Sequence, residues 1–207
     1  MLDPLMRPRR SASAAPRAIT LIEITVVLLV LGVLVTLATP SLRGMIELQR
    51  LRSINSELVT DLQFARTEAI SRNVPTTVKF SQNGQVTCYT IFRGSNTSSC
   101  DCTNGVGGAC TGAAVGREIR TVQIARSTGI TLAKVGTTLP NQFEYDPLTG
   151  GIRGISSDGS SMIPITYALD LKGSAAGRGW LRTVVSQAGR PTVCSKDGAN
   201  PAVVACP

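Results

Sequence analysis

A run of apolar residues near the amino terminus places the strongest limit on what this chain can fold into. Residues 19–39 read ITLIEITVVLLVLGVLVTLAT and contain one charged residue, Glu23. About twenty apolar residues in a helix are enough to cross a bilayer. We therefore expect residues 19–40 to form a hydrophobic transmembrane helix.

The residues on either side of this run predict its orientation. Residues 1–18 contain one acid, Asp3, and the four arginines Arg7, Arg9, Arg10 and Arg17. Because positive charge is kept on the cytoplasmic side of a membrane, everything after Pro40 should lie outside. All six cysteines follow Pro40, which agrees with an oxidising compartment.

Glu23 separates this run from the common kinds of N-terminal segment. A cleaved secretory signal has a shorter apolar core that ends at small residues, and Ala38-Thr39-Pro40 match such a site poorly. A plain membrane anchor fits the length of the run. Neither explains Glu23, since a carboxylate inside a spanning helix costs roughly 2.5–3.5 kcal/mol on insertion scales. We expect Glu23 to be functional and to have a cationic partner.

Residues 18–23 resemble the type IV prepilin processing motif, in which a small residue precedes the cut and a hydrophobic residue and Thr-Leu-Ile-Glu follow it. The matching residues are Ala18, Ile19, Thr20, Leu21, Ile22 and Glu23. Alanine stands where the family nearly always has glycine. The resemblance implies that prepilin peptidase cuts between Ala18 and Ile19, that residues 1–18 are a cleaved basic leader, and that the new amine of Ile19 is N-methylated.

The same resemblance implies roles for two further residues. Glu23 would pair with the N-terminal amine of an adjacent subunit, and a buried carboxylate becomes tolerable when it meets a buried cation. Pro40 lies where pilins often carry a proline that kinks the helix. The chain would first be a single-pass protein of the bacterial inner membrane with its body in the periplasm. Residues 19–40 would then enter the core of a pilus or pseudopilus filament.

From residue 41 to residue 73 the pattern becomes amphipathic, which predicts that the helix continues. Apolar residues recur every three or four positions and so lie on one helical face. They are Leu51, Ile54, Leu58, Leu62, Ala65 and Ala69. We expect this face to pack on a sheet and the helix to end at Asn73 and Pro75.

Charged residues lie between the apolar ones of this helix. Glu57 and Asp61 repel each other one helical turn apart, whereas Glu68 and Arg72 attract each other. Exposed pairs of this kind change stability by only about a few tenths of a kcal/mol. We therefore expect them to contribute little.

Residues 74–207 predict a β-rich extracytoplasmic domain. After Pro75 apolar and polar residues alternate with the period of a strand, and Asn83-Gly84 is a strong hairpin signal. The expected strands cover residues 76–82, 85–93, 118–125, 130–134, 142–146, 163–171 and 180–187. A long helix packed on six or seven short antiparallel strands is an α+β fold.

Two stretches resemble one branch of the pilin family, the minor pilins and pseudopilins of the GspH, FimT and FimU type. They are Leu62-Gln63-Phe64-Ala65-Arg66-Thr67-Glu68-Ala69 with Arg72, and Gly189-Arg190 followed by Cys194. The resemblance implies a pilin-like fold and a minor pilin that assembles at, or primes, the tip of a type IV pilus. The alternative is the H-type minor pseudopilin of the type II protein secretion system. Either would assemble with other pilins or pseudopilins through its N-terminal helix.

The six cysteines predict disulfides rather than a metal site. A zinc site needs four suitably spaced ligands, and the chain has no histidine. Cys194 and Cys206 are isolated near the C-terminus, so we expect them to pair, and the resemblance implies that their bond pins the tail onto the sheet. Cys88, on a predicted strand, would then pair with Cys100, Cys102 or Cys110. A pair of Cys100 with Cys102 is the least expected, because the ring that it closes would be strained.

We expect no enzymatic activity, no cofactor and no metal. Without histidine the chain cannot build a Ser-His-Asp or Cys-His site. Gly105, Gly107 and Gly108 superficially suggest a phosphate loop. They lack the Gly-Lys-Ser/Thr and the strand–loop–helix context that such a loop requires, so we interpret them as an ordinary flexible loop.

The C-terminal part offers a hypothetical site for duplex DNA. Residues 171–196 contain no acid and five basic residues, Lys172, Arg178, Arg182, Arg190 and Lys196. Arg178, Trp180 and Arg182 alternate and would share one face of a strand, where they could contact phosphates. The alternative is a solvated basic edge with Trp180 in the core. Some FimT-type pilins bind DNA through Gly-Arg-x-Arg; here Gly189-Arg190 match and the second arginine is absent.

Overall fold

The computed structural model describes residues 20–95, 99–112, 117–137, 140–155, 162–173, 179–196 and 203–206, apart from the side chains at positions 37–43, 155 and 162. The chain divides into two compact units, residues 1–42 and residues 43–207. We call residues 20–42 the N-terminal segment and residues 43–207 the body.

Helix α1 runs from Leu21 to Arg72, and its ends follow from local sequence. At its start the Glu23 N–H donates to the Thr20 side-chain oxygen at 3.3 Å, as a helix cap requires. At its end Asn73 has a φ of 53°, and the Val74 N–H donates to the Ala69 carbonyl at 3.2 Å, a left-handed cap that closes the last turn. The expected end of the helix is confirmed. The side chain of Pro40 lies outside the described ones, so a kink there stays a prediction.

Within the described residues of the body, ten strands form two sheets, and every strand pair is antiparallel. The six-stranded sheet has the order β3 (Glu118–Ala125), β2 (Val86–Arg93), β1 (Thr76–Gln82), β5 (Gln142–Tyr145), β6 (Ile152–Ile155) and β7 (Met162–Pro164). The four-stranded sheet has the order β10 (Pro191–Ser195), β9 (Trp180–Val185), β8 (Tyr167–Lys172) and β4 (Thr131–Lys134). Short 3-10 turns, η1 (Cys102–Asn104) and η3 (Arg126–Thr128), follow β2 and β3.

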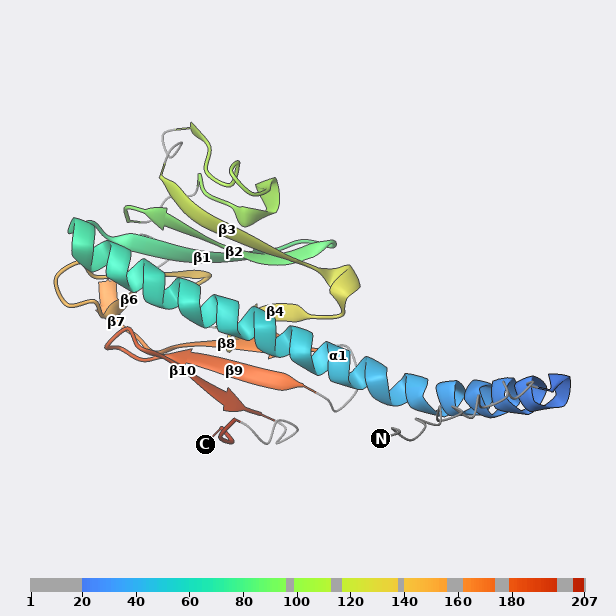
Figure 1. Ribbon diagram of the computed structural model, residues 1–207. Helices are drawn as coiled ribbons and strands as arrows, with labels where there is room; N and C mark the ends of the chain where they lie inside the picture. Colours follow the sequence, from blue (N-terminus) through green and yellow to red (C-terminus); the bar gives the residue numbers. More distant parts are fainter. Residues whose placement is uncertain are drawn as a thin grey trace, which may run out of the picture. The chain divides into compact units, whose positions relative to one another are not determined.

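The core of the body lies between α1 and the two sheets, across both of which the helix runs (Figure 1). Five of the six apolar residues expected to face the sheet are at most 1% exposed, and the sixth, Ile54, packs against them half-buried. Phe80 of β1 stacks on Tyr167 of β8 with ring centroids 5.6 Å apart, so aromatic contacts join the two sheets. The expected apolar face of the helix is confirmed.

The structure has the α+β fold expected from the sequence, with differences in the sheet. The strands are divided between two sheets instead of forming one. Strands β6 and β10 were not among the expected strands, and residues 163–171 are interrupted after Pro164 instead of forming one strand. Pro164 still pairs with Arg153 of β6, and the Ile165 N–H donates to the Ile152 carbonyl at 3.4 Å. The chain then passes to the four-stranded sheet, where it resumes as β8 at Tyr167.

Candidate functional site

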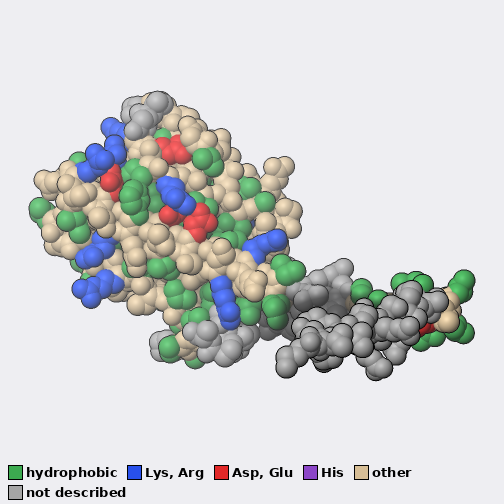
Figure 2. Space-filling view, in the orientation of Figure 1, with side chains coloured by type: hydrophobic (Ala, Val, Ile, Leu, Met, Phe, Trp, Pro, Cys, Tyr) green, Lys and Arg blue, Asp and Glu red, His purple; other side chains and the backbone are tan. Residues whose placement is uncertain are grey.

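The N-terminal segment exposes an almost continuous apolar surface. Twelve large apolar side chains between Leu21 and Val35 have exposed fractions from 50% to 82%. The hydroxyls of Thr25 and Thr36 donate to carbonyls of their own helix at 2.8 Å, so they do not make this surface polar. Glu23 is exposed among these residues and is the one charged side chain between positions 20 and 36. Figure 2 shows apolar side chains gathered on this part of the helix. A surface of this kind requires an apolar partner.

Two expectations about this segment concern its processing and its crossing of a membrane. Ala18 and Ile19, the expected processing residues, lie outside the described residues. Among those residues, no helix is both long enough and apolar enough to cross a membrane.

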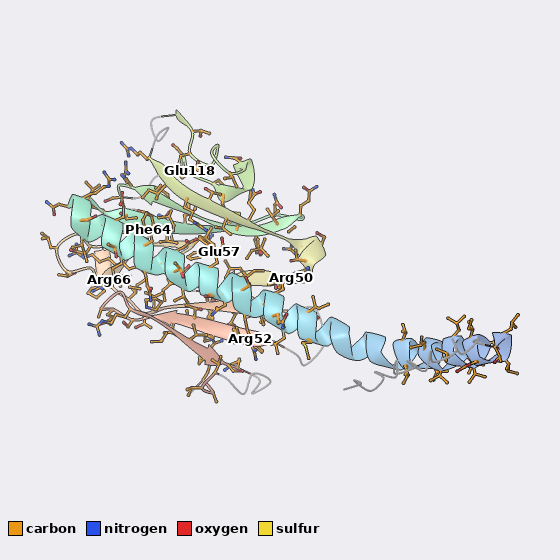
Figure 3. The ribbon with its side chains drawn as sticks, in the orientation of Figure 1. Arg50, Arg52, Glu57, Phe64, Arg66 and Glu118 are labelled. Carbon is orange, nitrogen blue, oxygen red and sulfur yellow. A yellow bond between two sulfur atoms is a disulfide. The ribbon has the colours of Figure 1, made fainter. Side chains whose placement is uncertain are left out.

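A buried carboxylate connects α1 to the six-stranded sheet. The Asp61 side chain is 5% exposed and accepts hydrogen bonds from the Tyr89 hydroxyl of β2 and from Arg120 Nε of β3, each at 2.7 Å. Arg120 also contacts Glu57 at 2.7 Å, on the side of α1 that faces β3 (Figure 3). Arg120 therefore neutralises the two acids that would otherwise repel each other.

Burial dominates the electrostatics of this cluster. Burial raises the pKa of Asp61, and the hydrogen bond from Tyr89 and the charge of Arg120 only partly oppose it. Burial and the neighbouring Asp61 raise the pKa of Tyr89, so its hydroxyl stays protonated and remains a donor. The cluster therefore acts as a fixed polar contact between helix and sheet.

Residues near the end of α1, in the stretch 62–72 that resembles the GspH, FimT and FimU branch, also hold this helix against the sheets. Glu68, 9% exposed, forms ion pairs with Arg72 of the helix and, at 3.0 Å, with Arg93 of β2. Arg66 Nε donates to the Gly150 carbonyl, in the turn between β5 and β6, at 2.9 Å. Through these contacts Arg66 and Glu68 have a structural role, because they fix the last turns of α1 over the six-stranded sheet.

Asp61 and Glu68 correct the expectation that the charged residues of the helix contribute little. Both carboxylates are buried, and each has an arginine partner on the sheet. The sequence carried a signal for these partners. Arg93 follows Tyr89 and Ile91 at intervals of two residues, and Arg120 precedes Val122 and Ile124 at the same interval. That spacing places each arginine on the sheet face that carries core residues.

The structure brings some of the expected DNA-binding residues together on the four-stranded sheet. Trp180 and Arg182 share a face of β9, with Lys172 and Asp170 opposite them on β8. Arg182 forms two hydrogen bonds to Asp170, at 2.7 and 3.0 Å, and the Lys172 ammonium lies 4.1 Å from the centre of the Trp180 ring. The hydrogen bond to Asp170 raises the pKa of Arg182. Asp170 therefore occupies Arg182 within the sheet, whereas Lys172 stays exposed over the Trp180 ring.

The other three basic residues lie apart from this pair. Arg190 is exposed in the turn between β9 and β10, and Lys196 is exposed just after β10. Arg178 lies outside the described residues. We expected Arg178, Trp180 and Arg182 to share one face of a strand. The structure describes two of them, Trp180 and Arg182, and these two do share a face.

Three disulfides account for the six cysteines. Cys194 pairs with Cys206, in agreement with the expected pairing, and the tail returns to β10 through the hydrogen bonds of Ser195 with Val204 and Cys206. Cys88 pairs with Cys102, one of the partners left open by the sequence, and Cys100 pairs with Cys110.

The disulfide Cys88–Cys102 holds the segment of residues 99–112 against the six-stranded sheet, and the disulfide Cys100–Cys110 closes that segment on itself. Cys102 is bonded to Cys88 of β2, and its carbonyl accepts from the Gln123 side chain of β3 at 2.6 Å. Glu118 accepts from the N–H groups of Gly107 and Ala109 at 2.9 and 3.0 Å (Figure 3). The glycines that suggested a phosphate loop therefore turn around a carboxylate of the protein itself.

Two crystal structures of the type IV minor pilin FimU of Pseudomonas aeruginosa (strain PAO1) are similar to this chain. One, in space group P21, is 17% identical over 71% of this chain and 90% of FimU, with a TM-score of 0.48. The other, in space group P65, is 16% identical over 70% of this chain and 92% of FimU, with a TM-score of 0.43. No curated protein sequence matches the chain.

Residues 55–189 match the family described as Type II transport protein GspH. The match runs from the second half of α1 through β9 and so covers more than half of the chain. It includes Asp61, Glu68 and their arginine partners Arg93 and Arg120. The protein is a member of the GspH family of type II transport proteins.

Proposed function

We propose that this protein is a minor pilin that assembles at, or primes, the tip of a type IV pilus. The observation that carries the proposal is the exposed apolar surface of the N-terminal segment with Glu23 in it. Family membership supports a role in assembly with other pilins or pseudopilins. The body is then a structural module without enzymatic function, and it presents its surface to neighbouring subunits.

Glu23 provides the register of this assembly. Prepilin peptidase removes residues 1–18, the freed amine of Ile19 is methylated, and Glu23 of one subunit pairs with the amine of the next. A buried carboxylate without a cation is costly, so the apolar segments associate only in the stagger that pairs these charges. Before assembly the same surface is covered by the lipid of the inner membrane.

A second candidate is the H-type minor pseudopilin of the type II secretion system. The observation that favours it is the family itself, which is described as a type II transport protein. Both candidates use the same apolar segment, so the contacts within the chain do not separate them.

A clean deletion separates the two machines. The deletion strain is scored in parallel for pilus assembly, DNA uptake and secretion of exoproteins, with the gene restored as control. Loss of piliation with secretion intact is the expected result. Loss of secretion with normal pili would assign the chain to the type II secretion system and overturn the first proposal.

Binding of duplex DNA by the basic C-terminal residues stays a hypothesis with its own test. Since Arg182 is held by Asp170, contact with phosphates would fall mainly to the exposed Lys172, Arg190 and Lys196. The full-length protein is titrated with duplex DNA across a range of salt concentrations. The hypothesis requires binding at low salt that weakens in Arg190→Ala and Lys196→Ala; absence of binding at low salt removes it.

A further inference from the structure

Two of the three disulfides cross each other in the sequence. Cys88 pairs with Cys102 and Cys100 pairs with Cys110, so the loop that each bond closes contains one cysteine of the other. Bonds between successive cysteines would instead join Cys88 to Cys100 and Cys102 to Cys110. We call the observed pairing crossed and the alternative consecutive.

The unfolded chain does not select the crossed pairing. The entropy of closing a loop changes only slowly with loop length, as about (3/2)RT ln n. The crossed bonds have sequence separations of 14 and 10 residues. Each consecutive bond closes a loop that is shorter by the spacing between Cys100 and Cys102, which favours the consecutive pairing by less than about twofold. Oxidation of an unfolded chain therefore forms both pairings in similar amounts.

The folded body selects the crossed pairing through β3. Cys88 of β2 lies opposite Gln123 of β3, and the Gln123 side chain donates to the Cys102 carbonyl at 2.6 Å. Cys100 and Cys110 lie opposite each other in a short antiparallel bridge. Strand β3 follows all four cysteines in the chain, and a chain is made from its N-terminus onward. The bonds can therefore form before the contacts that select them.

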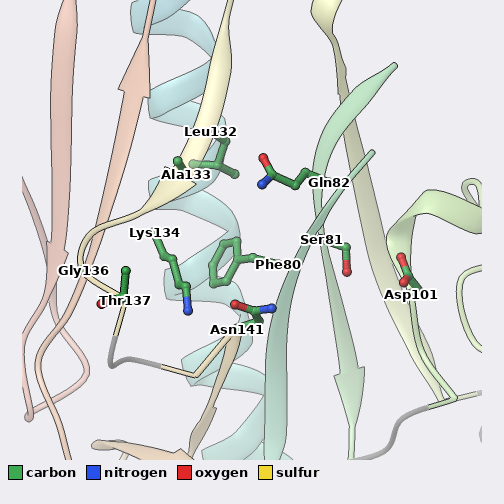
Figure 4. A pocket seen from close by; sticks show the side chains of 10 residues that line it. All are labelled: Phe80, Ser81, Gln82, Asp101, Leu132, Ala133, Lys134, Gly136, Thr137 and Asn141. Carbon is green, nitrogen blue, oxygen red and sulfur yellow. The ribbon is translucent and has the colours of Figure 1, made fainter. Parts of the chain in front are cut away.

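Asp101, which separates Cys100 from Cys102, adds a contact with β1. Its carboxylate accepts a hydrogen bond from the Ser81 side chain, and both residues line one pocket of the body (Figure 4). Ser81 lies opposite Cys88 in the pairing of β1 with β2. Asp101 therefore helps to place Cys102 beside Cys88 once these strands have paired.

The crossed disulfides are closed to solvent in the folded body. Their four cysteines are between 0% and 7% exposed. A chain that has formed both consecutive bonds has no free thiol left among these four cysteines, so they cannot exchange among themselves. Exchange then requires the thiolate of another molecule, which must act before the body closes over the sulfur atoms.

We infer that this protein is a substrate of a thiol–disulfide isomerase, which converts the consecutive pairing into the crossed one. A dithiol–disulfide oxidant first takes two electrons and two protons for each bond that it forms. The isomerase thiolate then attacks Cys100 and releases the Cys88 thiolate. Cys88 attacks Cys102 and releases the Cys110 thiolate. Cys110 finally attacks Cys100 in the mixed disulfide and releases the isomerase thiolate.

The exchange is balanced, since two disulfides of the protein become two others and the isomerase thiolate is regenerated. The inference rests on the proposed function for one point, the export of the body to an oxidising compartment. The disulfide Cys194–Cys206 reports on that point separately. It joins two successive cysteines, so an oxidant alone is enough to form it.

Peptide mapping of the full-length protein tests the inference. The protein is expressed in bacterial cells with and without a periplasmic thiol–disulfide isomerase, free thiols are blocked, and the chain is cut on the N-terminal side of aspartates. The cut before Asp101 leaves Cys88 and Cys100 on one peptide and Cys102 and Cys110 on the next. Crossed bonds link the two peptides, whereas consecutive bonds leave them separate. Fragmentation of the linked peptides in the mass spectrometer identifies the bonded cysteines.

Without the isomerase we expect the linked fraction to fall about twofold or more, because an unfolded chain forms the two pairings in similar amounts. The Cys194–Cys206 bond should form equally in both strains. Purified isomerase should restore the link in protein taken from the deficient cells. An isomerase whose attacking cysteine is replaced by serine should not restore it.

A double variant removes the competition between the pairings. In Cys100→Ser/Cys110→Ser, Cys88 and Cys102 have no other neighbouring partner, so their bond should form to the same extent with and without the isomerase. A bond in this variant that still depends on the isomerase would contradict competition as the cause. If the variant does not fold, the Cys194–Cys206 bond of the wild type remains as the control.

The outcomes separate this inference from the function on which it rests. Equal linked fractions in the two strains, with the Cys194–Cys206 bond formed, would overturn the inference alone. Absence of the Cys194–Cys206 bond from both strains would show that the body does not reach an oxidising compartment, and it would overturn the proposed function as well.

Discussion

At the scale of single residues, the contacts of α1 with the six-stranded sheet depend on two buried carboxylates. Asp61 meets Arg120, and Glu68 meets Arg93. A buried carboxylate tolerates few positions of its cation, because the geometry must offset the cost of desolvation. The two pairs therefore fix the rotation of the helix on the sheet more narrowly than apolar contacts do.

Replacing Arg120 should destabilise the body through Asp61. Arg120→Met leaves the Asp61 carboxylate with Tyr89 alone, and loss of a hydrogen bond to a charged group costs about 1.5–3 kcal/mol. Because a protonated Asp61 needs no cation, the cost should decrease as pH falls. Denaturation of the full-length protein at several pH values measures it. The exposed Arg117→Met is the control, and equal effects of the two changes would contradict the role of Asp61.

Glu118 should make the disulfide-bonded segment sensitive to acid. Burial raises the pKa of Glu118, but hydrogen bonds from the Thr121 hydroxyl and from the N–H groups of residues 107, 109 and 110 outweigh it and lower the pKa below its usual 4.5. A lowered pKa in the folded state adds stability above the unfolded value of about 4.5, which is lost as pH falls through the folded pKa. We therefore expect the wild type to exceed Glu118→Gln in thermal midpoint at neutral pH.

This difference should shrink once the pH falls below about 4.5. Hydrogen exchange of residues 99–112 measures the same effect locally. A difference between the wild type and Glu118→Gln that stays constant with pH would show that the charge of Glu118 does not hold the segment.

At the scale of elements, much of the fold follows from the sequence alone. The end of α1 at Asn73, the hairpin at Asn83-Gly84 and the strands β1, β2 and β3 could be predicted because each depends on local signals. Period, turn residues and caps act within a few positions of one another. The ion pairs of Asp61 and Glu68 were less predictable, since their arginine partners come from strands far along the chain.

The missed strands depend on tertiary contacts. Strand β6 contains Gly154, which weakens a strand, but β6 is held between β5 and β7 and lies against Ile165. Strand β10 begins with Pro191, which is tolerated at the first position of a strand and is stabilised by pairing with β9. The division into two sheets depends on long-range pairing in the same way, so no local pattern shows it.

The buried face of α1 should dominate the stability of the body. Leu62 is fully buried beneath the sheets, so Leu62→Ala should cost about 2–5 kcal/mol through lost contacts and a cavity. Its exposed neighbour is the matched control, since Gln63→Ala should change stability by less than about 0.5 kcal/mol. Chemical denaturation of the full-length variants measures both. Similar costs at the two positions would contradict the packing described.

At the scale of the whole molecule, the N-terminal segment and the body have different tasks. The body has its own hydrophobic core and three disulfides. The N-terminal segment exposes its apolar side chains and carries one carboxylate. The central claim is that this segment places the protein in a filament and that Glu23 sets its register.

Fractionation of sheared filaments tests this claim most directly. Full-length wild type, Glu23→Gln and Glu47→Gln, a control in the same helix, are quantified in the filament and membrane fractions of cells. The account predicts wild type and Glu47→Gln in filaments, with Glu23→Gln retained in the membrane in normal amounts. Recovery of Glu23→Gln in filaments at the wild-type level, or absence of the wild type from them, would contradict it.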